Sequence, residues 1–238
     1  MVLGLLTITS IPTVTGVAQG VSEQRRQNQQ KVDAKRMEKF CMDVVCEEGK
    51  DEHNLSGKRV VLKDEKVRTI SEPLFHRMAL LTRLIILQAY LDDPSPSHRS
   101  LKPSHTAQAF YISYPETEET KAHPRGLGLV SKVSDDPPML NWLYADKDTH
   151  EVKYGNRTQS IAHVVGPWDW ADEETTVTLE KKDMFVAVEE EDGKWAVYFD
   201  RDEDWCERVL AERGLDGKRV VDIRIRRKML EQVGGSAG

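Results

Sequence analysis

Beyond residue 40, hydrophobic positions mostly alternate with polar ones or gather in short apolar runs, and turn-forming residues separate these runs. Such segments are typical of strands that bury one or both faces. The clearest are "FCMDVVCEE" (40–48), "GKRVVLKDEKVRTI" (57–70), "AFYISY" (109–114), "RGLGLVSKVS" (125–134) and "NWLYADKDTHEVKYG" (141–155). The sequence therefore predicts an α+β, mostly β fold built on an antiparallel sheet, as a sandwich or an open barrel, with an N-terminal polar helix and one or two further helices.

The strongest local signal is a hairpin in "MFVAVEEEDGKWAVYFD" (184–200). Asp192-Gly193 lies between two runs rich in Val, Phe, Trp and Tyr, and a tight hairpin turn needs the positive φ that glycine adopts without strain. A helix is expected next, within 202–214, because a glycine ends the segment in the manner of a cap. A last alternating strand is expected within 217–228.

Three other segments read differently from the strands. "SEQRRQNQQKVDAKRMEKF" (22–40) is polar and rich in helix formers, so we expect a solvated helix. "LFHRMALLTRLIILQAYL" (74–91) places leucines at helical spacing and predicts an apolar helix that must be covered. Residues 1–22 carry no charged side chain, which leaves open a buried segment, a signal sequence or a membrane anchor.

The expected organisation is an apolar segment and polar helix over 1–40, one mostly β domain over 41–233 and a flexible tail over 234–238. A chain of 238 residues fits one globular core with appendages. The net charge is −6, and no block of positive charge spreads over a domain. Nucleic acid is therefore not an expected partner.

Cysteine use favours a reducing compartment. The cysteines are Cys41, Cys46 and Cys206, and they include no CxxC pair of the kind that completes a zinc site. We therefore expect a cytoplasmic protein. The alternative is a secreted protein with a Cys41–Cys46 disulfide and glycosylation at Asn54 and Asn156.

The sequence contains no nucleophile elbow, phosphate-binding loop or metal-ligand spacing. It therefore carries no catalytic signature, and we expect neither a metal nor a cofactor. The weak catalytic candidates are His163, Asp169 and Asp200. The histidine is in "SIAHVVGPWDW" (160–170), which alternates like a strand, and either carboxylate could orient its ring for general base chemistry. One histidine without a nucleophile is more typical of a structural role.

Aromatic residues offer the other route to function. "GPWDWADEE" (166–174) puts Trp168 and Trp170 at the same parity of an extended chain, so their rings are expected on one face. Together with Trp142 and Tyr144 they could line a ligand-binding groove. The alternative is that these large rings fill the core.

Three long stretches resemble those of a family of uncharacterised filamentous-fungal proteins: "DDPPMLNWLYADKDTHEVKYG" (135–155), "GPWDW" (166–170) and "FVAVEEEDGKWAVYFDRDED" (185–204). The resemblance covers the larger part of the chain, and it brings no established activity, cofactor or catalytic residue. Residues 76–103 depart from the family's pattern, which implies either an insertion or an intron translated through an error in the gene model; in both cases the segment is expected to pack poorly.

These observations favour a non-enzymatic binding or interaction module of a filamentous fungus, with an unknown protein or small molecule as its partner. A first alternative is a small accessory enzyme or ligand-binding protein of secondary metabolism, with His163, Asp169 and the tryptophans lining its pocket. A second is association with a membrane through residues 1–36, where basic side chains follow the apolar run.

Overall fold

The computed structural model describes residues 11–47, 54–66, 85–101, 104–115, 125–135, 138–171 and 173–230. Its elements are α1 (Ile11–Arg36), β1 (Phe40–Val45), β2 (Arg59–Lys66), β3 (Ile85–Asp92), β4 (His105–Thr106), β5 (Gln108–Ser113), β6 (Leu127–Asp135), β7 (Pro138–Ala145), β8 (Val152–Gly155), α2 (Arg157–Ser160), β9 (Trp168–Trp170), β10 (Val177–Leu179), β11 (Phe185–Glu191), β12 (Lys194–Phe199), α3 (Glu207–Glu212) and β13 (Val220–Met229). The chain divides into two compact units, Met1–Glu38 and Lys39–Gly238.

The first unit contains α1, which includes most of the expected polar helix. The helix begins at Ile11, so part of the apolar N-terminal segment is helical as well. Pro12 is tolerated there because the N–H groups of a first turn have no partner within the helix. Lys35 and Arg36 lie in the last turn, where positive charge interacts favourably with the helix dipole. Within the described part of the chain, no helix is both long and apolar enough to cross a membrane.

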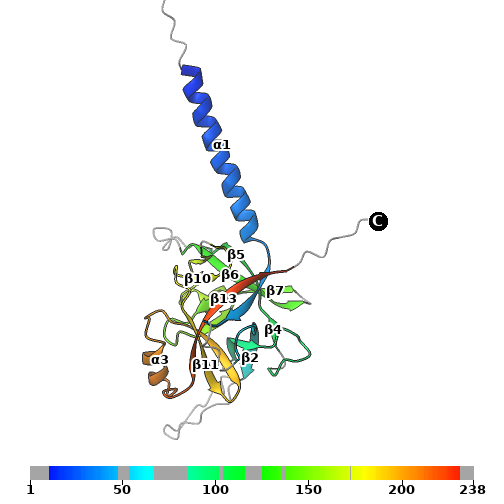
Figure 1. Cartoon of the computed structure of the whole chain (residues 1–238), viewed down its shortest axis with the longest axis vertical. Coiled ribbons are helices and arrows are strands. Elements are labelled where there is room, and N and C mark those ends of the chain that lie inside the picture. The colour runs from blue at the N-terminus through cyan, green and yellow to red at the C-terminus, as the bar shows by residue number, and fades with distance from the viewer. Residues whose placement is uncertain are drawn as a thin grey trace, which may run out of the picture. The chain divides into compact units, whose positions relative to one another are not determined.

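The second unit is an antiparallel sheet closed into a barrel (Figure 1). Its strands follow the order β12-β11-β13-β1-β5-β6-β7-β8-β3-β2-β4. The sheet closes because β12 also pairs with β3, at Trp195↔Leu91 and Ala196↔Tyr90. Closure removes exposed edges that could pair with other chains. The predicted mostly β, antiparallel fold is therefore confirmed, in barrel form.

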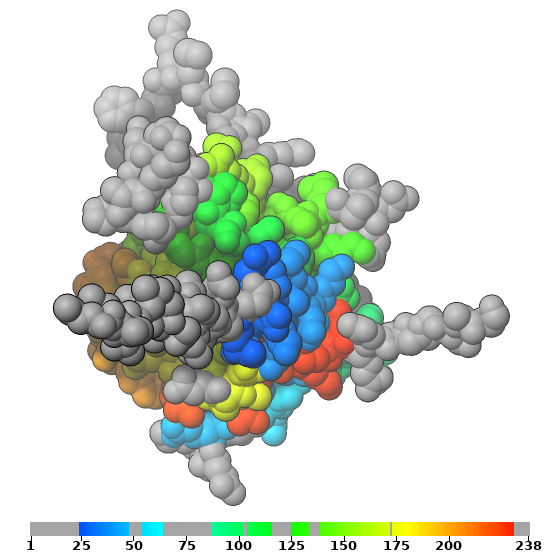
Figure 2. All heavy atoms as spheres, turned by 90° about the horizontal axis from the view of Figure 1, so that it is seen from above, coloured from blue at the N-terminus to red at the C-terminus, as the bar shows by residue number. Residues whose placement is uncertain are grey.

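The first and last strands of the barrel are neighbours. Antiparallel pairing joins β1 to β13 from Phe40↔Met229 to Val45↔Arg224. In Figure 2 the atoms of β1, in blue, lie against those of β13, in red. The barrel therefore depends on a contact between segments that lie at opposite ends of the domain's sequence.

Consecutive strands pair antiparallel at several places in the described sheet, including β2–β3, β5–β6, β6–β7, β7–β8 and β11–β12. The β11–β12 hairpin confirms the one predicted at Asp192-Gly193, and Gly193 has the expected positive φ, +70°. The helix and the final strand predicted after it are also confirmed, as α3 and β13.

The apolar helix expected over 74–91 is wrong in its described part, because Ile85–Asp92 forms the strand β3. β3 pairs with β2 along its whole length. Its alternate residues pack against the main core of the barrel: Leu87, Ala89 and Leu91. The leucine spacing is compatible with either structure over so short a run, and long-range strand pairing decides between them.

The poor packing expected of residues 76–103 is also wrong for the part that the structure describes. Leu91 is buried in the main core, and Leu101 is buried in a second cluster. Residues 76–84, 102 and 103 lie outside the described part of the chain, as does the tail at 234–238.

The hairpin β11–β12 is buried on both faces, and strand alternation explains how. Phe185, Ala187, Trp195, Val197 and Phe199 belong to the main core of the barrel. The intervening residues of the same strands belong to a second cluster, which α3 covers with Val209 and Leu210. Figure 1 shows α3 beside β11. The hairpin thus positions α3 on the outside of the barrel.

Trp168 is the largest side chain that is fully buried in the barrel, with 1% of its surface exposed, and its ring stacks on Phe185 at 6.2 Å. We expect Trp168→Ala to lower the free energy of unfolding by about 3–5 kcal/mol, through lost burial and the cavity left behind. Urea unfolding followed by circular dichroism measures this. Trp205→Ala, at a half-exposed ring, is the matched control and should cost much less. Equal losses from the two variants would contradict this description of the core.

Candidate functional site

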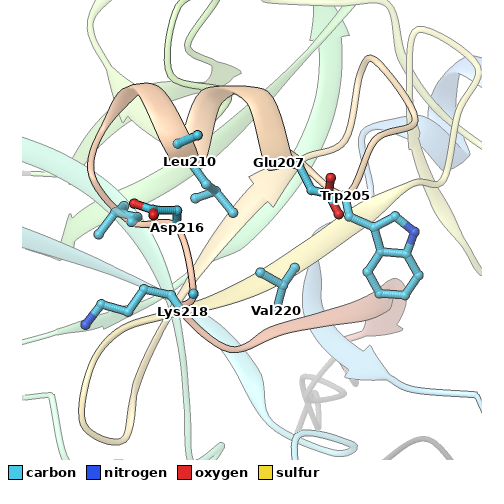
Figure 3. A pocket seen from close by; sticks show the side chains of 9 residues that line it. Trp205, Glu207, Leu210, Asp216, Lys218 and Val220 are labelled. Atoms are coloured by element: carbon cyan, nitrogen blue, oxygen red, sulfur yellow. The ribbon is translucent and has the colours of Figure 1, made fainter.

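A pocket of about 420 Å³ opens between α3 and the segment that leads into β13. Figure 3 shows Trp205 and Glu207 at one end of this pocket and Asp216 and Lys218 at the other, with Leu210 and Val220 between them. We call it the Trp205 pocket. Its volume lies within the range of small-molecule sites, which are concave, largely apolar and carry a few polar groups.

The apolar floor of the Trp205 pocket is continuous with the packing under α3. Leu210 is buried in the second cluster, and Leu215 and Val220 pack against that cluster. Gly214 and Gly217 have φ values of +68° and +79°, which let the chain turn back from α3 toward β13. The floor is therefore fixed by the same contacts that attach α3 to the barrel.

The loop before α3 holds Trp205 in an uncommon backbone conformation. Glu203, Trp205 and Cys206 have φ values of +61°, +59° and +57°. Each non-glycine residue in this left-handed region costs on the order of 1–2 kcal/mol. Trp205 nevertheless remains 48% exposed, so burying its ring is not what offsets this cost. Other contacts must hold the loop in place.

The carboxylate of Asp200 supplies those contacts. Its Oδ1 accepts the backbone N–H groups of Asp204 at 3.1 Å and of Cys206 at 3.3 Å, and its Oδ2 accepts that of Trp205 at 3.1 Å. Asp200 itself is buried. Bonds from backbone N–H groups to a carboxylate are stronger than neutral ones. Asp200 is therefore a positioning residue for Trp205, a role that differs from the predicted one of orienting the ring of His163.

Ion pairs fix the same loop from outside. Arg201 donates to both carboxylate oxygens of Glu180, at 2.8 and 2.9 Å. Arg208 of α3 contacts Asp202 at 2.6 Å. Exposed pairs of this kind are worth little individually, and their effect here is to restrict the positions that the loop can take.

The side chains that line the Trp205 pocket offer an apolar surface and hydrogen-bonding groups to a ligand. An exposed indole offers a flat apolar face, while Glu207 and Asp216 offer acceptors and Lys218 offers a donor. Within the ranges that the structure describes, no group of three or more His, Cys, Asp or Glu side chains could hold a metal ion.

His163 lies elsewhere and has other partners. Its Nδ1 accepts the backbone N–H of Lys147 at 3.3 Å, and its ring stacks on Tyr144 at 5.1 Å. Asp146 is 3.7 Å from the same nitrogen. An acceptor nitrogen carries no proton, so we interpret the Asp146 contact as proximity without a hydrogen bond. These contacts make His163 part of the turn between β7 and β8, with neither Asp169 nor Asp200 among its partners in the described structure.

The carboxylate beside His163, that of Asp146, makes its hydrogen bonds with groups of the same turn and with Lys153 of β8. Burial raises the pKa of Asp146, but hydrogen bonds from Lys153, at 2.8 Å, and from the N–H groups of Asp148 and Thr149 lower it to about 2. The strand expected around His163 is also wrong, because Arg157–Ser160 forms α2 and residues 161–163 form a turn.

The tryptophans of "GPWDW" are packing residues. Trp168 and Trp170 both pack with the main core, which is the shared face that their parity predicts. The guanidinium of Arg227 lies 4.2 Å from the centre of the Trp170 ring and 4.8 Å from that of Phe40. Asp169 lies between the two tryptophans in the strand, at the position of opposite parity. Its backbone carbonyl accepts a hydrogen bond from the Tyr111 hydroxyl at 3.1 Å.

Trp142 and Tyr144 belong to a third, smaller cluster with Tyr114 and Val165. The Trp142 and Tyr114 ring centres are 4.6 Å apart. Burial raises the pKa of the Tyr144 hydroxyl, which opposes its ionisation. The four aromatic residues predicted to line one groove therefore lie in two separate clusters.

The three cysteines are buried free thiols, so the disulfide considered between Cys41 and Cys46 is not formed in this structure. Burial raises the pKa of Cys206 above that of an ordinary thiol, and the carboxylate of Asp200 adds to the effect. A raised pKa makes this thiol a poor nucleophile.

Trp205 was not among the site residues predicted from the sequence. A signal was present: this tryptophan interrupts a run of charged residues, "DRDEDWCER" (200–208), where no alternating pattern requires a buried ring. Its partners Asp216 and Lys218 come from the turn before β13. That proximity depends on how α3 packs, which local periodicity does not reveal.

Asp200→Asn removes the charge that holds the loop and leaves one acceptor oxygen for three N–H groups. We expect a loss of about 1–3 kcal/mol in the free energy of unfolding. We also expect faster hydrogen exchange at the amides of Asp204, Trp205 and Cys206, measured by NMR. Asp202→Asn, which breaks an exposed pair on the same loop, is the matched control and should cost less than about 1 kcal/mol. Unchanged exchange in Asp200→Asn would show that the carboxylate does not hold the loop.

Comparison with known proteins identifies the family. The model of the fungal β-trefoil domain matches residues 16–231, which include all of the described barrel. Searches of curated proteins and of solved structures gave no match. The match spans far more than half of the sequence, and the closed antiparallel barrel agrees with it. The chain therefore belongs to the fungal β-trefoil domain family.

Proposed function

We propose that this domain is a non-enzymatic ligand-binding module whose site is the Trp205 pocket, and that its ligand is a small molecule with one apolar face and several hydroxyl groups, such as a carbohydrate. β-Trefoil domains often bind ligands or proteins, which supports a binding role in general. The specific proposal depends on the pocket itself.

The observation that carries the proposal is an exposed tryptophan held in a costly conformation. The left-handed loop buries Cys206 under α3, but it presents the ring of Trp205 to solvent, where the ring adds little to the stability of the fold. Conformations of this kind cluster at ligand-binding sites, where a fixed ring avoids the loss of side-chain freedom on binding. Asp200 and the ion pairs of the loop keep Trp205 fixed in this way.

The polar residues of the Trp205 pocket indicate the kind of ligand. Glu207 and Asp216 can accept hydrogen bonds from hydroxyl groups, and Lys218 can donate one. The pocket carries charges of both signs, so it does not select strongly for an anion or a cation. A sugar ring matches this arrangement, because its C–H face can cover the indole while its hydroxyls reach the charged residues at the ends.

The catalytic alternative receives no comparable support from geometry. His163 contacts the β7–β8 turn, Asp200 holds the loop before α3, and Asp169 lies on β9. A general base needs to lie within hydrogen-bonding reach of its partner and of a substrate.

Binding of the full-length protein to an array of neutral and amino sugars tests the proposal. Any sugar that binds is then titrated by calorimetry. We expect Trp205→Ala to weaken its affinity by about tenfold or more, equivalent to about 1.4 kcal/mol. Trp205→Phe should retain much of the affinity, because a flat ring remains. Met139→Ala, at an exposed apolar residue outside the pocket, is the control and should bind normally. Tight binding by Trp205→Ala would refute the proposed site.

A further inference from the structure

A second pocket lies apart from the Trp205 pocket and has different chemistry. It has a volume of about 200 Å³ and is lined mainly by six polar or charged residues: Arg99, Ser104, His105, Thr106, Gln108 and Lys132. They come from the loop after β3, from β4 and from the paired strands β5 and β6, in which Gln108 lies opposite Lys132. No Asp or Glu belongs to the described lining, although the whole chain carries a net charge of −6.

Arg99 places a buried positive charge beside this pocket. Its side chain is only 8% exposed. The guanidinium donates to the carbonyls of Asp93 at 3.1 Å, Ser104 at 3.4 Å and Pro94 at 3.5 Å, and to the hydroxyl of Thr106. All four acceptors are neutral. These bonds orient the guanidinium without neutralising it.

The buried carboxylate of the same loop does not supply the missing negative charge. Asp92 accepts the backbone N–H groups of Asp93, Ser100 and Leu101, at 2.8, 3.0 and 2.7 Å. Over the part of the chain that the structure describes, no ion pair joins Arg99 to an acidic side chain. A buried charge without a counter-charge is costly, so an anion in the adjoining pocket would stabilise it.

Ser104 provides an independent observation at the same place. Its Oγ is shielded from solvent and has no hydrogen-bond partner among the described residues. Such an orphaned hydroxyl is rare and calls for an explanation. Ser104 lines the pocket, so rotation of its side chain about χ1 would bring this unpartnered hydroxyl to an acceptor bound there. Gln108 adds an amide donor, and Lys132 and His105 add two groups that can carry positive charge.

We propose that this pocket binds a small oxyanion: the phosphate or sulfate group of a soluble ester, or the free ion. The ion accepts hydrogen bonds from Ser104 Oγ, Gln108 and Lys132, while Arg99 acts behind them as a fixed positive charge. The volume admits a tetrahedral anion and the first atoms attached to it. This site is independent of the Trp205 pocket and does not rest on the function proposed there.

NMR titration of the full-length protein tests the proposal, with inorganic phosphate, sulfate and glycerol 1-phosphate as probes and chloride holding the ionic strength constant. We expect saturable shifts at the amides of residues 104–108 and 132. Lys132→Gln and Ser104→Ala should each weaken phosphate binding by about tenfold. Lys147→Gln is the matched control, because it removes one positive charge from an exposed residue outside the pocket. The control and Trp205→Ala should both leave phosphate affinity unchanged.

Several outcomes would contradict the proposal that this pocket binds an oxyanion. The absence of a response beyond that to chloride would do so, as would equal weakening in Lys147→Gln, which would indicate a general charge effect. Circular dichroism establishes that each variant is folded, and full affinity in both folded pocket variants would also count against it. Binding only to phosphatidic acid vesicles, without binding to the soluble ions and ester, would reject the proposal in favour of a membrane surface.

Discussion

The barrel depends on the closure of its sheet around a filled interior. Strands that lie far apart in the chain must meet, β1 with β13 and β12 with β3, and inward-facing side chains must fill the space that they enclose. Phe40, Trp168, Phe185 and Phe199 supply much of that volume. At the closing strand, Arg227 packs its guanidinium over the rings of Phe40 and Trp170. Cation–π contacts of this kind suit a buried arginine, because the rings replace part of its hydration.

A filled interior means that binding chemistry must lie on the outside of the barrel. The hairpin β11–β12 shows how the fold provides for this, since its outer face is also apolar and is covered by α3. Covering that face creates the groove beside α3 and the loop that presents Trp205. The polar pocket near Arg99 arises in a comparable way, where the loop after β3 folds over β4 and the strands β5 and β6. At both pockets the barrel supports a connecting loop, and residues of that loop form part of the pocket lining.

Most of the strands could be predicted from the sequence because their patterns are local. The alternation of apolar and polar residues predicted β1, β5, β6 and β7, and Asp192-Gly193 predicted the β11–β12 hairpin. The segment at 85–92 could not be assigned in this way, because leucines at that spacing suit a helix as well as a strand and only pairing with β2 decides between them. Aromatic residues showed the same limit. Trp168 follows turn-forming residues and Trp205 follows acidic ones, so neither context predicts a buried ring. Trp168 nevertheless fills the core, while Trp205 remains half exposed.

The candidate site was harder to predict than the fold, since it joins residues that are neighbours only after α3 docks. Asp200 was recognised as a candidate, but its three backbone hydrogen bonds show that it acts on the loop rather than on a substrate. We propose that ligands bind outside the filled barrel, at the Trp205 pocket. An amide-resolved NMR titration with the sugar that binds best tests it most directly. We expect the largest changes in chemical shift within residues 205–220. Larger changes at Val197, Phe199 and the Trp168 indole would place the ligand inside the barrel and contradict it.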